Sequence, residues 1–279
     1  MRTIERTLES EVAPVGTFTV RRALPAPGRR SIGPWVFLDH FGPFRVTPGV
    51  DGVGPHPHAG IETVTYLLSG RNRHRDSAGH EGIVGPLGAQ WMTAGKGIVH
   101  AEAPLAESED ELTMHGIQLW TSLPRARKLM ERKYQRLPAA AIPEFSRDGA
   151  AIRVVAGELE GHHGPAQVEM PLFLYHVRLD AGARISLALP DEFEAGAYVV
   201  DGAPVVNGKR TKTSQLVVFD KVPGSVDLAT EQPAELMLLG GAPAEGPLVF
   251  HGPFVMNSVE QVRFAERAYM SGQMGHLDA

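Results

Sequence analysis

The sequence contains no cysteine, which excludes disulfides and thiolate metal sites. Any bound metal must therefore be held by His, Asp or Glu side chains. Basic residues are not in excess: 27 Lys and Arg stand against 32 Asp and Glu, a formal net charge of −5, which argues against a direct nucleic-acid partner. No apolar run approaches a membrane span, and the N-terminus lacks the apolar core of a secretory signal. We therefore expect a cytoplasmic protein without a membrane partner.

The length and the remaining composition are those of a folded globular protein. With 279 residues the chain can form one large domain or two of ordinary size, and 43% hydrophobic residues supply ample core. The densest basic cluster is the run RNRHRD at residues 71–76. On a hairpin its three arginines would share one face, which we interpret as a solvated edge, with a local anion or partner contact as the alternative.

Two short pairs of metal-ligand residue types stand out between residues 54 and 102. The segment begins GPHPHAGIETVTYLLSG and ends GAQWMTAGKGIVHAE, and it contains His56-x-His58 and His100-x-Glu102. Successive side chains of a β-strand point to opposite faces, so residues i and i+2 share a face. If both stretches are strands, each pair aims two ligands at one point. The sequence therefore predicts one metal site built from these four residues.

The residues around these pairs favour strands. Thr63 to Leu67 are all β-branched, aromatic or aliphatic, as expected of a strand. Residues 72–88 are rich in Gly and charge and are predicted to form turns and a hairpin that bring the two ligand strands together. Gly88, Gly95 and Gly97 precede the second pair and allow a tight turn there.

Three imidazoles and one carboxylate suit a divalent first-row metal such as iron, manganese, nickel, copper or zinc. Around an octahedral ion, four protein ligands leave two positions for a substrate or dioxygen. Around tetrahedral zinc, the same four would close the shell and indicate a structural site. The residue types alone leave both alternatives open.

The rest of the chain is predicted to form mainly strands. Before and after the ligand segment we predict strands at residues 15–24, 34–40 and 112–119, and in the second half at residues 151–155, 172–179, 183–189 and 216–219. The run RARKLMERKYQRL after Pro124 favours a short surface helix or an extended linker, and PAAAIP at residues 138–143 marks a domain boundary. Ser258-x-x-Gln261 is a capping-box pattern, which predicts a helix through Tyr269.

Four polar residues near the predicted site have open roles. Glu62 would share the face of His58 if the strand continues, so it is either a carboxylate that orients a histidine or an outward edge residue. His40 belongs to an Asp-His pair whose members face opposite ways on a strand, and we predict a structural or supporting role. His115 is likewise predicted to be structural, whereas Gln118 could line a cavity as a hydrogen-bonding group.

A family resemblance is carried by four motifs: GPHPHAGIETVTYLLSG, WMTAGKGIVHAEAP, HGIQLW and HGPFVMN. Over nearly the whole chain they resemble the pirin family of the cupin superfamily. The resemblance implies an all-β fold of two tandem cupin (jelly-roll-like) β-barrels with a short linker helix and a C-terminal helix. It implies a metal-binding domain at residues 1–135 and a second domain at residues 136–279 that has no metal site and whose tail returns towards the first.

The resemblance also implies the ligands and the metal. The ligand positions of the family fall on His56, His58, His100 and Glu102. The cofactor would be one divalent ion, Fe(II) in the first place, with Mn, Ni, Cu, Co or Zn as alternatives. Glu102 would also be the carboxylate nearest the substrate proton, and hence the candidate catalytic base.

Pirin resemblance implies functions of different classes. Some members have quercetin 2,3-dioxygenase activity, in which a deprotonated flavonol is held at the metal and dioxygen opens its heterocycle with loss of carbon monoxide. Others are non-catalytic, iron-dependent redox-sensing regulators that bind a transcription factor or a metabolic enzyme. A cupin isomerase or lyase, which needs the metal but no oxygen, is a third alternative. Because an incomplete ligand shell suits exchangeable ligands, we predict a dioxygenase that takes a flavonol-like substrate and dioxygen.

Overall fold

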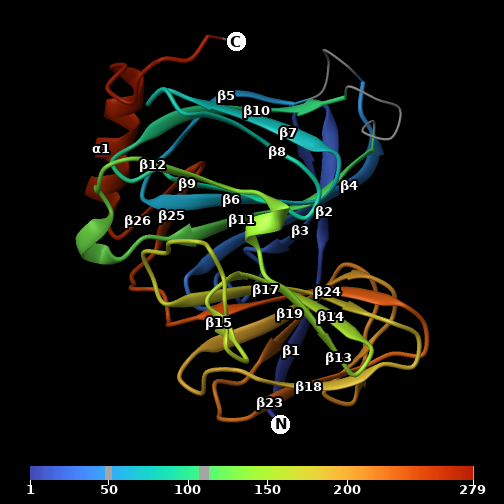
Figure 1. Ribbon diagram of the computed structural model, residues 1–279. Coiled ribbons are helices and arrows are strands. Elements are labelled where there is room, and N and C mark those ends of the chain that lie inside the picture. The colour runs from blue at the N-terminus through green and yellow to red at the C-terminus, as the bar shows by residue number, and fades with distance from the viewer. Residues whose placement is uncertain (48–51, 107–112, 279) are drawn as a thin grey trace. The chain divides into compact units, whose positions relative to one another are not determined.

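The computed structural model describes residues 1–47, 52–106 and 113–278 of the chain (Figure 1). Within these residues 56% lie in β-strands and 7% in helices, with one α-helix, and the expected all-β class is confirmed. By packing, the chain divides into two compact units, each assembled from segments that are not contiguous in sequence. The first unit comprises Met1–Glu11, Arg21–Phe37 and Ala140–Ala244, and the second comprises Val12–Val20, Leu38–Ala139 and Glu245–Ala279.

The second unit carries all four predicted ligands between two sheets. Its larger sheet has the strand order β12 (Lys133–Leu137), β9 (Ala89–Thr93), β6 (Ile61–Ser69), β11 (Thr113–Ser122), β4 (Trp35–Arg45), β3 (Phe18–Leu24) and β2 (Glu11–Val15). Its smaller sheet has the order β5 (Val53–His58), β10 (Ile98–Leu105), β7 (Arg71–Asp76) and β8 (Glu81–Val84). The smaller sheet forms one layer and the strands β9, β6 and β11 the other (Figure 1).

The first unit also has a larger and a smaller sheet. The larger sheet has the order β1 (Ile4–Glu9), β22 (Gln215–Phe219), β19 (Glu194–Asp201), β24 (Ala234–Gly241), β17 (Leu172–Leu179), β14 (Ala150–Ala156) and β13 (Glu144–Arg147). The smaller sheet has the order β18 (Arg184–Ala188), β23 (Ser225–Ala229), β20 (Val205–Val206) and β21 (Lys209–Arg210). A short ribbon pairs β15 (Glu158–Leu159) with β16 (His162–His163).

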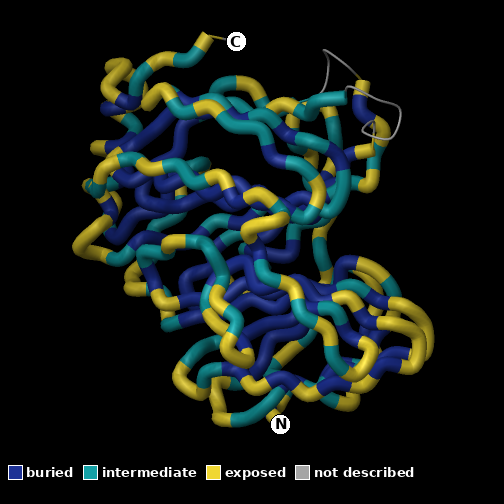
Figure 2. Tube along the Cα trace, viewed as in Figure 1, coloured by how far each residue is buried: buried dark blue, intermediate teal, exposed yellow. Residues whose placement is uncertain are grey.

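Each unit buries its own apolar side chains, and buried backbone runs through the strands of both (Figure 2). In the first unit, alternate strand residues point inward and form a continuous core that includes Ile152, Val177, Leu187, Val217 and Leu236. In the second unit, one apolar cluster gathers Val20, Phe41, Val46, Leu67, Val84 and Met114. The second of these clusters includes Leu67 of β6 and Met114 of β11, two strands of the larger sheet of the ligand-bearing unit.

The C-terminal segment belongs to the second unit and confirms the predicted helix. Strands β25 (Val249–His251) and β26 (Phe254–Met256) form a ribbon that leads into α1 (Val259–Met270). The Ser258 hydroxyl accepts a hydrogen bond from the Gln261 amide at 3.2 Å, and the Gln261 side chain accepts from the amide of Asn257 at 2.9 Å. Apolar side chains of this segment pack against Ala59 and Val99, which lie next to the predicted ligands in sequence. The buried cluster is Ala59, Val99, Phe254, Met256, Val262, Ala265, Ala268 and Met274.

The linker after Pro124 differs from the predicted short helix. The described residues form a 3₁₀ turn, η2 (Arg125–Arg127), and then the strand β12, which pairs in register with β9. A second 3₁₀ turn, η3 (Ala139–Ala141), follows. Helix-forming composition is overridden because the strand gains backbone hydrogen bonds from β9 and buries Leu137.

Two further sequence expectations concern the chain as a whole. The predicted domain boundary between residues 135 and 136 lies close to the junction at Ala139–Ala140 between two packing segments. The division into contiguous domains stays a prediction. Among the described residues, no helix has both the length and the apolar composition needed to cross a membrane.

Candidate metal centre

The two predicted ligand strands are neighbours. Strands β5 and β10 pair antiparallel, with His56 opposite His100 and His58 opposite Ile98. The turn after β5 depends on Gly60, because its φ is +76° and a Cβ there would collide with the carbonyl oxygen of Val255. This pairing confirms the prediction that the two ligand pairs lie on strands that are brought together.

Three of the predicted ligands converge. The ring centroids of His56, His58 and His100 are between 4.3 and 5.0 Å apart. One ligand nitrogen from each of them lies within 4.8 Å of the other two, the one such group found among the described residues. A group with this spacing could hold one metal ion.

The hydrogen bonds of these imidazoles leave one nitrogen of each for a cation. Nδ1 of His56 lies 2.8 Å from the carbonyl oxygen of Gly54, and Nδ1 of His58 lies 3.1 Å from that of Pro253. A carbonyl only accepts, so both Nδ1 atoms carry hydrogen, and in the neutral form of each ring Nε2 carries the lone pair. The Nε2 atom of His100 is buried and has no hydrogen-bond partner within the described part of the chain. The donor set therefore fits a divalent metal ion bound through Nε2.

Burial keeps two of the imidazoles neutral. His58 is 3% exposed and His100 is 1% exposed. Burial, followed by the charge of His56, lowers the pKa of His58 to about 3, and the hydrogen bond to Pro253 offsets part of this. The pKa of His100 is held well below its usual value by burial and then by His56, His58 and His74. At neutral pH both side chains are therefore in the unprotonated form that binds metal.

Glu102 lies two residues beyond His100 on β10 and so on the same face of that strand. It is not part of the group of three imidazoles defined by the 4.8 Å spacing. Its Oε1 accepts hydrogen bonds from Thr65 Oγ1 at 2.6 Å and from Asn72 Nδ2 at 3.0 Å. These two donors fix the carboxylate, and its assignment as the fourth ligand stays a prediction.

Two side chains of β11 are neighbours of these groups. Gln118 lies opposite Thr65 in the ladder, and its Oε1 is 2.7 Å from the Thr65 hydroxyl that also contacts Glu102. Trp120, two residues further along the same face, makes a T-shaped contact with the His58 ring, with 4.9 Å between centroids. Gln118 is therefore a hydrogen-bonding neighbour of the candidate site.

A buried polar row on β7 was missed by the sequence interpretation. Asn72, His74 and Asp76 are buried and alternate with the partly exposed arginines of the same strand. Strand β7 pairs with β10, which sets Asp76 opposite His100 and His74 opposite Glu102. The alternation of RNRHRD contained this signal, but the interpretation as a solvated edge considered only the arginine face.

Glu62 does not continue the first ligand strand. The turn at Gly60 separates β5 from β6, so the condition for Glu62 to share the face of His58, an unbroken strand, is not met. Glu62 is buried, so the outward edge alternative is wrong. Its two carboxylate oxygens accept hydrogen bonds from Thr93 at 2.8 Å and from Thr121 at 3.1 Å, its neighbours on the adjoining strands. It is three residues from Thr65 and so points to the opposite face of β6.

His40 and His115 form a pair outside the imidazole group. Their Nε2 atoms are 2.6 Å apart, and their rings are stacked with 4.9 Å between centroids. His40 is buried on β4 and His115 is half-buried on β11. This mutual contact supports the structural roles expected for both.

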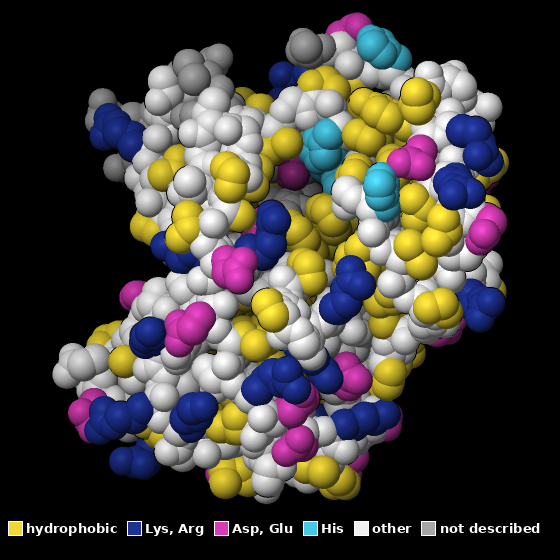
Figure 3. Space-filling model, turned by 180° about the vertical axis from the view of Figure 1, so that it is seen from behind, with side chains coloured by type: hydrophobic (Ala, Val, Ile, Leu, Met, Phe, Trp, Pro, Cys, Tyr) yellow, Lys and Arg dark blue, Asp and Glu magenta, His cyan; other side chains and the backbone are white. Residues whose placement is uncertain are grey.

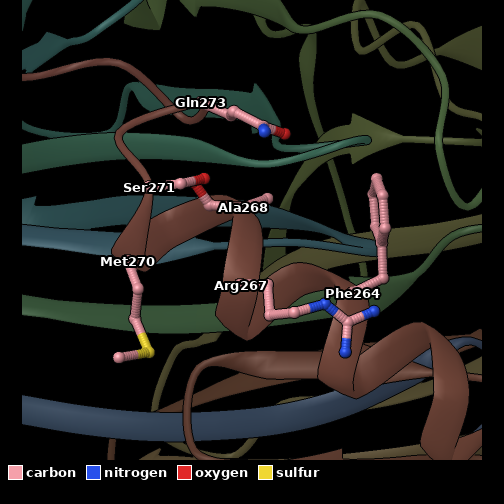
Figure 4. A pocket seen from close by; sticks show the side chains of 6 residues that line it. All are labelled: Phe264, Arg267, Ala268, Met270, Ser271 and Gln273. Carbon is pink, nitrogen blue, oxygen red and sulfur yellow. The ribbon is translucent and has the colours of Figure 1, made fainter.

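The candidate site is open to solvent on one side. His56 is partly exposed although its two partners are buried, and histidine side chains reach the surface among hydrophobic ones on the face shown in Figure 3. A different hollow lies on α1 and is lined by Phe264, Arg267, Ala268, Met270, Ser271 and Gln273 (Figure 4). None of the predicted ligands lines it, so it is separate from the imidazole group.

The fold and the site together define a two-barrel protein of the cupin class with an imidazole cluster in one barrel. The Pirin family model matches residues 17–121, and the model described as the Pirin C-terminal cupin domain matches residues 174–275. A pirin-like protein of Caulobacter vibrioides is 36% identical over 265 residues, which cover 93% of this chain and 91% of the relative. The chain belongs to the pirin family, and the resemblance and the two cupin domains are confirmed.

Two further relatives are named for an enzyme activity. A Pseudomonas aeruginosa protein, provisionally named as a quercetin 2,3-dioxygenase, is 37% identical over 262 residues and 90% of each chain. A crystal structure of quercetin 2,3-dioxygenase from Acinetobacter baumannii matches with a TM-score of 0.91 and 30% identity, over 98% of this chain and 91% of the other.

Proposed function

We propose that this protein is a metal-dependent dioxygenase of the quercetin 2,3-dioxygenase type that acts on a flavonol-like substrate. The observation that carries the proposal is the group of three imidazoles, two of them buried and all with a nitrogen left for a cation, open to solvent at His56. The names of the bacterial relatives support the reaction class. An exchangeable position beside three nitrogen ligands is what substrate binding requires.

Four side chains would hold the ion in this proposal. His56, His58 and His100 would bind one divalent metal through Nε2, and Glu102 would complete the set, with Fe(II) as the first candidate and Mn, Ni, Cu, Co or Zn as alternatives. When bound, such an ion acts as a Lewis acid that lowers the pKa of a flavonol hydroxyl beside its carbonyl.

Glu102 is the proposed catalytic base. Its Oε1 accepts from Thr65 and Asn72, which orients the carboxylate and leaves Oε2 for its two proposed roles in turn, as a metal ligand without substrate and as the acceptor of the hydroxyl proton with substrate bound. Gln118 contacts the same threonine hydroxyl and so restricts its rotation. Glu102 is two residues from His100 on β10 and so shares its face of the strand, which supports this proposed role.

Oxygen uptake tests the proposal directly. The protein is purified without oxygen, its metal content is measured, and it is reconstituted separately with Fe(II), Mn, Ni, Co, Cu and Zn. With at least one metal we expect quercetin to drive oxygen uptake with release of carbon monoxide. No uptake with any of these metals would contradict the dioxygenase and favour the regulator alternative.

The role of Glu102 is tested by substitution. Glu102→Gln keeps the size of the side chain but removes the base, so turnover should fall by about 100-fold or more. Glu62→Gln is the matched control, because Glu62 is another carboxylate that accepts two side-chain hydrogen bonds, but it faces away from Thr65. Its turnover should stay within a few-fold of wild type. A Glu102→Gln variant with wild-type turnover would refute the assignment.

A further inference from the structure

The hydrogen-bond partner of His100 Nδ1 differs in kind from the Nδ1 partners of His56 and His58. His56 and His58 each donate from Nδ1 to a backbone carbonyl, whereas Nδ1 of His100 lies 3.4 Å from Nδ1 of His74. A carbonyl can only accept, so it fixes the tautomer of its histidine directly. An imidazole nitrogen can donate or accept. The tautomer of His100 therefore depends on that of His74.

Asp76 determines the tautomer of His74. Its buried carboxylate lies with Oδ2 3.1 Å from His74 Nε2 and 2.9 Å from His80 Nδ1, and Oδ1 accepts from the backbone amides of Ala78 at 2.9 Å and His80 at 3.1 Å. A carboxylate only accepts, so His74 carries its hydrogen on Nε2. Neutral His74 then has a lone pair on Nδ1, and the hydrogen between the two Nδ1 atoms belongs to His100.

The consequence for His100 is a lone pair on Nε2. That atom is buried and without a hydrogen-bond partner in the described part of the chain, and His100 belongs to the group of three imidazoles. The ring of Tyr134 is stacked on His74, with 4.6 Å between centroids and 15° between planes, which restrains rotation of the His74 ring.

We propose that Asp76 and His74 are positioning residues that select the tautomer of His100 and hold its Nε2 ready for the metal. In metal sites a carboxylate often orients a ligand histidine directly, and here the same effect passes through one additional imidazole. The inference rests on the metal site of the proposed function and is independent of the substrate.

The metal-free wild-type protein provides the first test. Long-range ¹⁵N–¹H NMR spectra distinguish the two ring nitrogens of each histidine and show which one carries hydrogen. We expect hydrogen on Nδ1 of His100 and on Nε2 of His74. Hydrogen on Nε2 of His100 would overturn the proposal, and this result requires no variant to fold.

Cobalt(II) affinity provides the second test, measured by competition with a chromophoric chelator. His74→Phe keeps a ring against Tyr134 but removes the acceptor for His100, so the affinity should fall by about 10–100-fold. His80→Gln is the matched control, because His80 also bonds to Asp76 but does not contact His100, and its affinity should stay within about threefold. Wild-type affinity in His74→Phe would refute the proposal.

These tests are separable from the test of the proposed function. Neither NMR nor cobalt(II) binding involves a flavonol or oxygen, so a lack of oxygen uptake would refute the dioxygenase and leave the positioning role supported. Equal cobalt(II) affinities of the wild type and His74→Phe would refute the positioning role and leave the dioxygenase proposal standing.

Discussion

At the scale of single residues, His58 and His100 combine a proposed role in metal binding with deep burial. Burial is the main reason that the pKa values of both are lowered, to about 3 for His58. A neutral imidazole avoids the cost of burying a charge, and it offers its lone pair without first releasing a proton. In the metal-free protein the same burial makes the fold sensitive to acid.

Acidification should destabilise the metal-free protein between about pH 6.5, where a histidine of the unfolded chain takes up a proton, and about pH 3, the pKa of folded His58. In this window the unfolded state binds more protons than the folded state. The free energy of unfolding should therefore fall by about 1.4 kcal/mol for each pH unit lowered, for each histidine kept neutral in this way. Urea unfolding at a series of pH values measures the slope.

Substitutions separate this effect from the general protonation of carboxylates. His58→Gln removes one buried titrating group, so its stability should depend less on pH in the same window. His251→Gln is the control, because the side chain of His251 is 62% exposed, and its slope should equal that of wild type. Identical slopes for wild type and His58→Gln would contradict the burial argument.

The ligand residue types were predictable from the sequence, but their tautomers were not. The i, i+2 spacing of His56 and His58 predicted a shared face, and the structure brings both rings beside His100. The nitrogen that His58 presents depends on its contact with Pro253, and the nitrogen that His100 presents depends on its contact with His74. Local periodicity does not connect either partner to the ligands. Only the folded chain brings these partners together.

At the scale of elements, Lys128 ties three segments of the second unit together. It is 1% exposed, and its Nζ donates to the carbonyl oxygens of Gly60 and Val255 at 2.7 and 2.8 Å and to the Ser122 hydroxyl at 2.8 Å. Burial lowers its pKa to about 7, and the charge of Glu245 opposes this in part. The contact joins β26 to the turn that follows the ligand strand β5.

Lys128→Met should loosen this junction. The substitution keeps the apolar stem but removes three donors, and each buried acceptor left unsatisfied costs about 1–3 kcal/mol, partly offset by the loss of a buried charge. We expect the free energy of unfolding to fall by about 2 kcal/mol or more and the amides of β26 to exchange hydrogen faster. Chemical denaturation and hydrogen exchange measure the two effects.

Lys96→Met is the matched control for this substitution. Lys96 is 44% exposed and pairs with the exposed Glu131, so its loss should change stability by no more than about 0.5 kcal/mol. If Lys128→Met shows the stability and exchange rates of wild type, the hydrogen bonds of Lys128 do not hold the junction.

Strands were predictable where local composition and tertiary pairing agree. The run Thr63 to Leu67 is continuous in strand-forming residues and lies inside β6. The strand β12 was predicted as helix or linker, because its composition favours a helix and only the pairing with β9 makes it a strand. In β7 the alternation of arginines with other polar residues was visible in the sequence, but the sequence does not show that β7 pairs with β10.

At the scale of the whole molecule, packing joins segments that are distant in sequence. The segment Glu245–Ala279 belongs to the unit of the ligand strands, and its Pro253 carbonyl accepts the hydrogen of His58 Nδ1. The segment Met1–Glu11 belongs to the other unit, where β1 pairs with β22. Periodicity predicts elements but not their long-range partners, so the sequence indicated two barrels without showing how the terminal segments are shared between them.

The central claim is that one metal ion binds to His56, His58 and His100 through Nε2, with Glu102 as the fourth ligand. Its most direct test is a crystal structure of the metal-loaded protein with anomalous scattering recorded at the absorption edge of the metal. We predict a single peak about 2.0–2.2 Å from the three Nε2 atoms and from one oxygen of Glu102. A peak elsewhere in the protein, or one bound through the Nδ1 atoms, would contradict the claim.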